Sequence, residues 1–111
     1  MKATTTRVVN FTPTPKFPLG QIVSTPAAIE FLADNDRANA GAALSQKLLG
    51  RHQSGDWGDM GDEDKRTNDG SLGAGEDAGR IFSSYNVGDG KVWIITEYDR
   101  SVTTILLPSD Y

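Results

Sequence analysis

Three short segments in the last third of the chain constrain its fold most, because each is rich in β-branched and aromatic residues. They are residues 81–87, 92–97 and 102–107. This composition is typical of β-strands. Asp89 and Gly90 separate the first two segments and tolerate positive φ, which predicts a tight hairpin turn at these two residues. Residues 98–101 form a second short connection, so we expect a three-stranded antiparallel β-meander.

The middle segment has apolar side chains on both of its predicted faces. Side chains alternate along a strand, so Val92 and Ile94 share one face. Trp93 and Ile95 share the other. A strand with one solvated face would show polar residues on that face instead. We therefore expect this strand to be covered on both sides, at least in part, either by the helices alone or by the helices together with a partner.

The first half of the chain has helical signals. Thr25 is suited to cap a helix and Pro26 to begin it, and the helix is expected to end near residues 34–36. A second helix is predicted over about 39–52, on an apolar stripe of leucines. A third is expected to begin at Asp62, with a break within 68–78, where glycines accumulate. Residues 21–23 are a further candidate for a short strand.

These elements predict a single small α+β domain, with two to three helices followed by the meander. A length of 111 residues fits one domain. Pro13, Pro15 and Pro18 interrupt any regular structure near the beginning, so residues 1–18 are interpreted as an N-terminal arm and residues 19–111 as the domain. Within the arm, residues 7–11 are a candidate edge strand.

Composition argues against several classes of function. The chain has no cysteine and a net charge of −4, so disulfides and thiolate metal sites are excluded. An acidic run between Asp56 and Asp77 is unlike the basic surface that binds duplex nucleic acid. No apolar run is long enough to span a membrane and no targeting signal is visible, so we expect a cytoplasmic protein without membrane contact.

The polar residues of the 51–66 region are the best candidates for chemistry. Arg51, His52, Asp56 and Asp59 lie close together in the sequence. A lone histidine beside a helix end more often has a structural role, and the acidic turn does not fit the ligand spacing of an EF-hand. We therefore predict no cofactor, no metal and no catalytic set, and interpret these four residues as candidates for contacting a partner.

Trp57 lies in a glycine- and aspartate-rich turn, where no periodic pattern accounts for a large ring. One interpretation is that its ring fills the junction between the helices and the sheet. The other is that it anchors a recognition surface, since Trp is often an energetic anchor at interfaces. The first interpretation predicts a buried ring.

Four segments together carry a resemblance to a known family. They are residues 17–26 (FPLGQIVSTP), 51–58 (RHQSGDWG), 92–97 (VWIITE) and 99–108 (DRSVTTILLP). The chain resembles, over about residues 17–108, small bacterial proteins borne on plasmids and integrative elements and described as plasmid-related proteins. Some carry a type I restriction subunit label, which this chain is too short to support. The resemblance implies an accessory protein of a mobile genetic element.

The function expected from these observations is non-enzymatic binding of a host or element protein, including inhibition of a defence system. Two alternatives remain open. One is a small enzyme or nucleotide-binding module that uses the 51–66 region. The other is a structural homo-oligomer, in which an apolar sheet face forms a homodimer.

Overall fold

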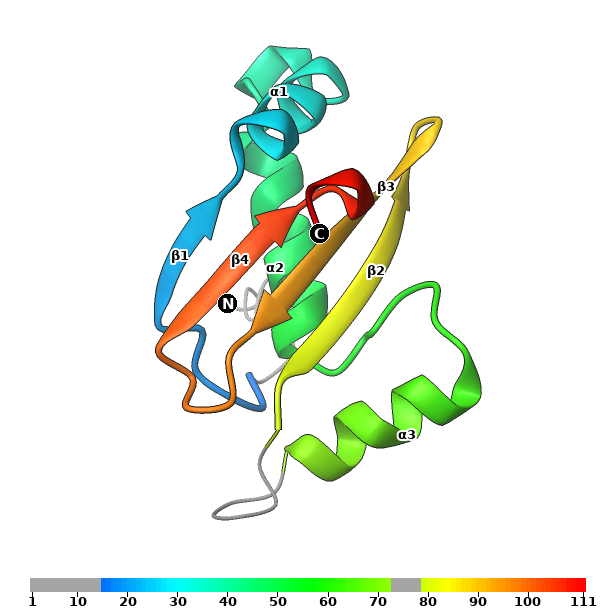
Figure 1. Ribbon diagram of the computed structural model, residues 1–111. Coiled ribbons are helices and arrows are strands. Elements are labelled where there is room, and N and C mark those ends of the chain that lie inside the picture. The colour runs from blue at the N-terminus through cyan, green and yellow to red at the C-terminus, as the bar shows by residue number, and fades with distance from the viewer. Residues whose placement is uncertain (1–14, 73–78) are drawn as a thin grey trace, which may run out of the picture.

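Four strands form one sheet in the order β1-β4-β3-β2, seen face-on in Figure 1. The computed structural model describes residues 15–72 and 79–111. The strands are β1 (Gln21–Ser24), β2 (Ile81–Val87), β3 (Gly90–Thr96) and β4 (Val102–Leu106), and the helices are α1 (Pro26–Asp34), α2 (Ala42–Gln53) and α3 (Asp62–Ser71). Two short 3-10 turns, η2 (Arg37–Asn39) and η4 (Pro108–Asp110), complete the described elements.

The α+β prediction is confirmed, and the sheet contains the expected antiparallel meander of β2, β3 and β4. The sheet is nevertheless larger than predicted, because β1 joins it as a fourth strand. β1 lies parallel to β4, with Gln21 beside Val102. The sheet is therefore mixed. A pairing between residues this far apart in the chain leaves no local sequence pattern.

The hairpin turn lies one residue earlier than predicted. Val87 pairs with Gly90, so the two connecting residues are Gly88 and Asp89. Gly88 has a φ of +54°, as a hairpin turn with glycine at its first position requires. A Cβ at Gly88 would lie 2.3 Å from Oδ1 of Asn35, at the end of α1. The contact with α1 therefore favours glycine at this position.

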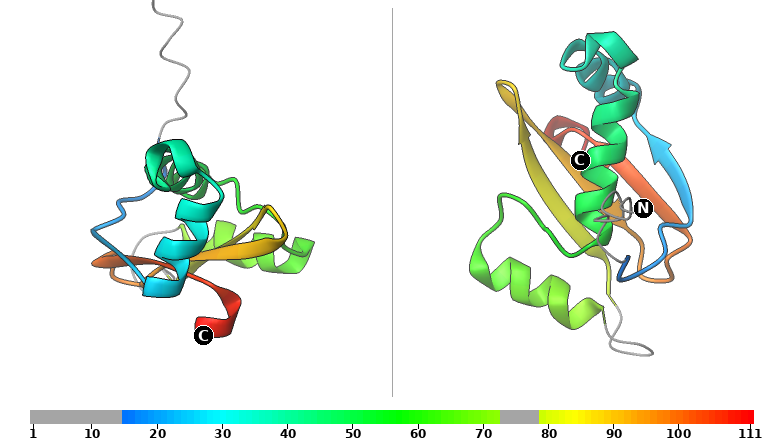
Figure 2. Two further views of the ribbon diagram at one scale, coloured as in Figure 1. Left: turned by 90° about the horizontal axis from the view of Figure 1, so that it is seen from above. Right: turned by 180° about the vertical axis from the view of Figure 1, so that it is seen from behind.

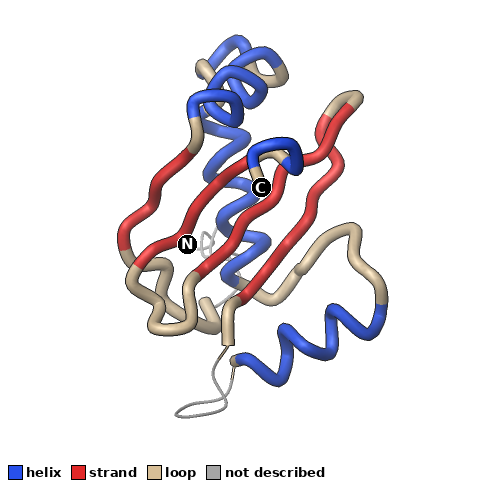
Figure 3. The backbone as a smooth tube through the Cα atoms, in the orientation of Figure 1, coloured by secondary structure: helices blue, strands red, loops and turns tan. Residues whose placement is uncertain are grey.

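Helices α1 and α2 pack on one face of the sheet. Figure 3 shows α2 behind the strands, and the right view of Figure 2, seen from behind, shows it in front of them. Thr25 caps α1 as predicted, since its Oγ1 accepts from the amide of Ala28 at 3.2 Å. Helix α2 begins at Ala42 rather than near residue 39, because η2 and the left-handed residues Ala40 and Gly41 precede it. Buried side chains of α1, α2 and the strands that they cover form the main core: Ala28, Leu32, Leu48, Tyr85, Val87, Val92, Ile94 and Ile105.

Helix α3 lies beside the outer edge of β2 instead of on a sheet face. It continues through Gly70 to Ser71, so the break predicted within 68–78 does not occur at 68–71. Residues 73–78 are outside the described part of the chain. A second core cluster, made of Phe17, Trp57 and Ile81, joins this region to the sheet. Phe17, from the expected arm, is thus packed into the domain.

In the part of the chain that the structure describes, the opposite face of the sheet has no long helix over it, although Ile95 and Leu106 on this face are only 3% and 6% exposed. Within the described residues, only the short turn η4 and the C-terminal Tyr111 lie against it (Figures 1 and 2). The middle strand is therefore covered by helices on one side only. Figure 2 shows η4 alone on the other side.

Candidate functional site

Arg51 and Asp56 form an ion pair at the end of α2. Nε of Arg51 lies 2.7 Å from Oδ2 of Asp56, and both side chains are partly exposed. The guanidinium also stacks over the ring of Tyr85, at 4.6 Å from its centroid. The hydrogen bond from Arg51 lowers the pKa of Asp56 below its usual value. Asp56 also accepts from the amide of Gly58, so this pair holds the turn after α2 in place.

Asp59 belongs to a different arrangement. Its carboxylate pairs with the ammonium of Lys91 on β3, and this interaction lowers the pKa of the Asp59 carboxyl. Asp59 also attaches the turn to the sheet, because its amide donates to the carbonyl of Ser84 at 2.6 Å. Its side chain is directed to Lys91, away from the Arg51–Asp56 pair.

His52 is fully buried between α2 and the sheet. Its Nδ1 lies 2.6 Å from Oγ of Ser83, and its Nε2 lies 2.9 Å from Oγ1 of Thr96. Burial, with a smaller contribution from the charge of Arg100, lowers its pKa from 6.5 to about 3. The imidazole is therefore neutral at neutral pH, and a ring with no exposed surface does not contact a solute.

The hydrogen bonds around His52 determine its tautomer. Thr103 donates its only hydroxyl proton to the carbonyl of Leu19 at 2.7 Å. Thr96 must then donate to Thr103, 2.7 Å away, and its own oxygen accepts from Nε2 of His52. Nδ1 of His52 therefore carries no proton and accepts a hydrogen bond from the hydroxyl of Ser83. This chain of directed bonds joins α2 to three strands, so the role of His52 is structural, although it does not cap helix carbonyls.

Trp57 is 4% exposed, which confirms the prediction that its ring fills the junction between the helices and the sheet. The indole packs near Phe17 and His52, with centroids 6.3 and 6.1 Å away. Its Nε1 donates to Oδ1 of Asp69 on α3 at 3.0 Å. Gly58 follows with a φ of +79° and lies against the backbone of Ser84, so no larger residue fits there. The ring offers almost no surface to a partner.

The five sequence-predicted site residues are thus not brought together in one site, although Arg51 pairs with Asp56 and His52 packs near Trp57. Arg51 and Asp56 face solvent as a pair, Asp59 is paired with Lys91, and His52 and Trp57 are buried. This region organises the connection between α2 and β2. In the described residues, no three His, Cys, Asp or Glu side chains gather in a way that would hold a metal ion.

The open face of the sheet carries a cluster that sequence reasoning did not identify. Phe82 and Trp93 pack edge to face, with centroids 4.9 Å apart, and Tyr111 lies against both rings. Tyr111 is 70% exposed. We call Phe82, Trp93, Tyr111 and Arg80 the aromatic cluster. Its only sequence signal was the apolar second face of β3, since Arg80 and Tyr111 lie far from Trp93 in the chain.

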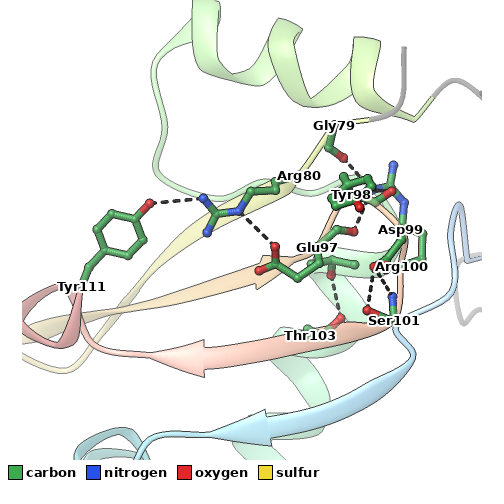
Figure 4. Close-up of polar contacts among 10 residues, drawn as sticks. Gly79, Arg80, Glu97, Tyr98, Asp99, Arg100, Ser101, Thr103 and Tyr111 are labelled. Atoms are coloured by element: carbon green, nitrogen blue, oxygen red, sulfur yellow. Dashed lines mark hydrogen bonds and ion pairs between the residues drawn. The ribbon is translucent and has the colours of Figure 1, made fainter. Parts of the chain in front are cut away.

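Arg80 connects the aromatic cluster to a charged rim. Its Nη1 donates to the hydroxyl of Tyr111 at 3.3 Å, and its Nε lies 3.6 Å from the carboxylate of Glu97. Figure 4 shows the three side chains on one side of the sheet. About half of each charged side chain remains exposed, so the pair still has surface for a third group.

A hollow of about 270 Å³ lies next to this cluster, between α3 and β2. Its lining mixes apolar and polar side chains: Met60, Asp64, Thr67, Asn68, Arg80 and Phe82. Phe82 and Arg80 therefore belong both to the hollow and to the aromatic cluster. The open face and the hollow form one continuous surface.

Arg100 holds α3 beside this surface. The side chain donates to the carbonyl of Gly79 at 2.5 Å (Figure 4). It also donates to the carbonyl of Ser71 at 2.5 Å, and so joins the end of α3 to the beginning of β2. Arg100 has a φ of +60°, a conformation that costs a residue other than glycine roughly 1–2 kcal/mol. The two carbonyl contacts explain why an arginine occupies a position that glycine would fit without strain.

No protein-family model matches the chain, and the comparisons with curated proteins and with solved structures find no match either. Among the described helices, none is both long and apolar enough to cross a bilayer. The proposed function therefore depends on the geometry of the site and on the sequence resemblance alone.

Proposed function

We propose that this protein is a non-enzymatic binding domain that contacts another protein through the aromatic cluster. The observation that carries the proposal is the position of Trp93, Tyr111 and Arg80 on a sheet face without helical cover. Trp, Tyr and Arg are the residue types most enriched at the energetic centres of protein interfaces. The adjacent hollow provides a concave site for one side chain of a partner.

The charges of this surface favour a protein over a nucleic acid. Exposed aromatic rings on a sheet also stack bases in proteins that bind single strands. Such proteins add unpaired cations for the phosphates. Here Arg80 lies beside Glu97 and Lys91 is paired with Asp59, and the chain as a whole has a net charge of −4. A partner with a mixed, weakly charged surface fits this arrangement better.

The alternative of a small enzyme in the 51–66 region has less support. Its polar residues are divided among an ion pair at the end of α2, a second ion pair with β3 and a buried histidine. A general base must reach the proton that it removes, and His52 has no exposed surface. The resemblance to plasmid-related proteins supports the further proposal that the protein serves a mobile genetic element, for example as an inhibitor of a defence system.

A pull-down from a bacterial lysate with matched variants tests this proposal. Trp93→Ala and Arg80→Ala remove the centre of the cluster, and Tyr98→Ala removes a ring that is 65% exposed and outside the cluster. We expect wild type and Tyr98→Ala to capture the same protein, and both cluster variants to lose it while keeping a native circular dichroism spectrum. Equal capture by all four proteins, or capture of nuclease-sensitive material only, would refute the proposal.

A further inference from the structure

The two edges of the sheet differ in how the chain itself covers them. At β2, the amide of Ser84 donates to Trp57 O at 3.1 Å, and Ser84 O accepts from Asp59. The side-chain amide of Asn68 imitates a further strand, since it bonds both the carbonyl and the amide of Phe82, at 2.6 and 3.1 Å. The β2 edge is thus closed. On the β1 side, the described residues contain no strand beyond β1.

The main chain of β1 directs half of its polar groups away from the sheet. The amides of Gln21 and Thr25 donate to Ser101 and Ile105, which flank or belong to β4. Main-chain groups alternate along a strand, so those of Ile22 and Ser24 point outward. Edge strands are usually protected by charges, proline or a bulge. The sequence of β1, Gln-Ile-Val-Ser, has neither charge nor proline.

Exposed aliphatic side chains gather along this same edge. Ile22, Val23 and Ile29 are 48%, 38% and 56% exposed, and they are three of the five exposed large hydrophobic residues in the described part of the chain. A hollow of about 140 Å³ lies beside Ser24, with Ile29, Leu32 and Ile105 among its lining residues. This edge therefore offers main-chain hydrogen bonds, apolar side chains and a small apolar hollow together.

We infer that a second copy of this chain pairs with the β1 edge, antiparallel, through its own β1. The outward groups of Ile22 and Ser24 set the register. Ile22 then forms a hydrogen-bonded pair with the partner's Ser24, and Ser24 forms one with the partner's Ile22. Val23 lies opposite the partner's Val23 on the twofold axis. The two sheets join into one continuous sheet.

This register is self-complementary, which favours a second copy over an unrelated peptide. Ile22 and Ser24 pair with Thr103 and Ile105 on β4, so both face the helices. The partner's Ile22 is therefore placed beside Ser24, at the hollow next to Ile29. This one arrangement thus covers Ile22, Val23 and Ile29 in both copies of the chain. A strand of four residues buries less than the ~1,600 Å² of a standard interface, so the dimer is expected to be weak.

Cross-linking at Val23 tests the register, because the protein has no cysteine. Facing residues of a non-hydrogen-bonded antiparallel pair have Cα atoms ~4.5 Å apart, a separation that permits a disulfide. Under mild oxidation, we expect Val23→Cys to form a covalent dimer at least tenfold faster than Tyr98→Cys, whose side chain is more exposed. Equal rates for the two variants would overturn the register.

A second measurement addresses association without a cross-link. Light scattering or sedimentation of the wild type is expected to show a concentration-dependent dimer between micromolar and millimolar protein. Val23→Lys places two like charges on the twofold axis and is expected to be monomeric with an unchanged melting temperature, whereas Tyr98→Lys still dimerises.

A monomeric wild type whose Val23→Cys thiol resists alkylation would overturn the inference, and would indicate that another segment of the same chain covers β1. The test does not depend on the aromatic cluster, which lies on β2, β3 and the C-terminal turn.

Discussion

The two faces of the sheet are made from alternate residues of the same strands, yet they have opposite characters. On the helix-covered face, Ile94 and Thr96 are fully buried. Every buried polar side-chain atom in the described residues has a hydrogen-bond partner. On the open face, Trp93 and Phe82 are only partly buried and the charges remain at the surface. The first face is buried along β2, β3 and β4, whereas the second buries Ile95 and Leu106 but leaves its aromatic cluster partly exposed for contact.

Truncation of the two tryptophans gives the largest expected contrast. Trp57→Ala removes a buried ring and is expected to lower the free energy of unfolding by ~3–5 kcal/mol. Trp93→Ala, on the open face, is expected to cost only roughly 1–2 kcal/mol, because less apolar surface returns to water. Urea denaturation of both variants measures the difference. A loss for Trp93→Ala as large as that for Trp57→Ala would contradict the division between the faces.

The buried histidine predicts a pH dependence for the covered face. The pKa of His52 is about 3 in the folded protein, below the ordinary 6.5, so the unfolded chain binds the proton more tightly. Stability that is complete above pH 6.5 is lost as the pH falls towards 3. Between pH 7 and 5 the loss amounts to about 2 kcal/mol.

His52→Gln is the matched control, because glutamine bonds to hydroxyls but does not titrate in this range. Urea denaturation at pH 7, 6 and 5 is expected to give a slope for the wild type and a nearly flat profile for the variant. Parallel profiles for the two proteins would show that the titration of this histidine does not control stability.

Tyr111→Ala gives the smallest expected change in stability. Its ring is mostly exposed, so the free energy of unfolding is expected to stay within about 0.5 kcal/mol of wild type. Because the same ring completes the aromatic cluster, capture of the partner in the pull-down is expected to fall at least fivefold. A stable variant with full capture would limit the binding surface to Phe82, Trp93 and Arg80.

Local patterns in the sequence predicted much of the covered face. The Thr25 cap and the strands of the meander depend on residues that are neighbours in the chain. The turn was misplaced by one residue because the contact between Gly88 and Asn35 is tertiary. The aromatic cluster was missed for a similar reason, since Arg80, Trp93 and Tyr111 meet only once the sheet has formed. The grouping of Arg51, His52, Asp56 and Asp59 was misleading, because adjacent positions around a helix end point in different directions.

The position of β4 has a consequence for how the protein is made. β4 is the last of the four described strands in chain order, yet it lies inside the sheet, between β1 and β3. Its parallel partner begins at Gln21, opposite Val102. Before residues 102–106 have been synthesised, β1 lacks its parallel partner β4. The pairings of β4 with β1 and with β3 therefore form only after residues 102–106 have been synthesised, later than the local β2–β3 hairpin.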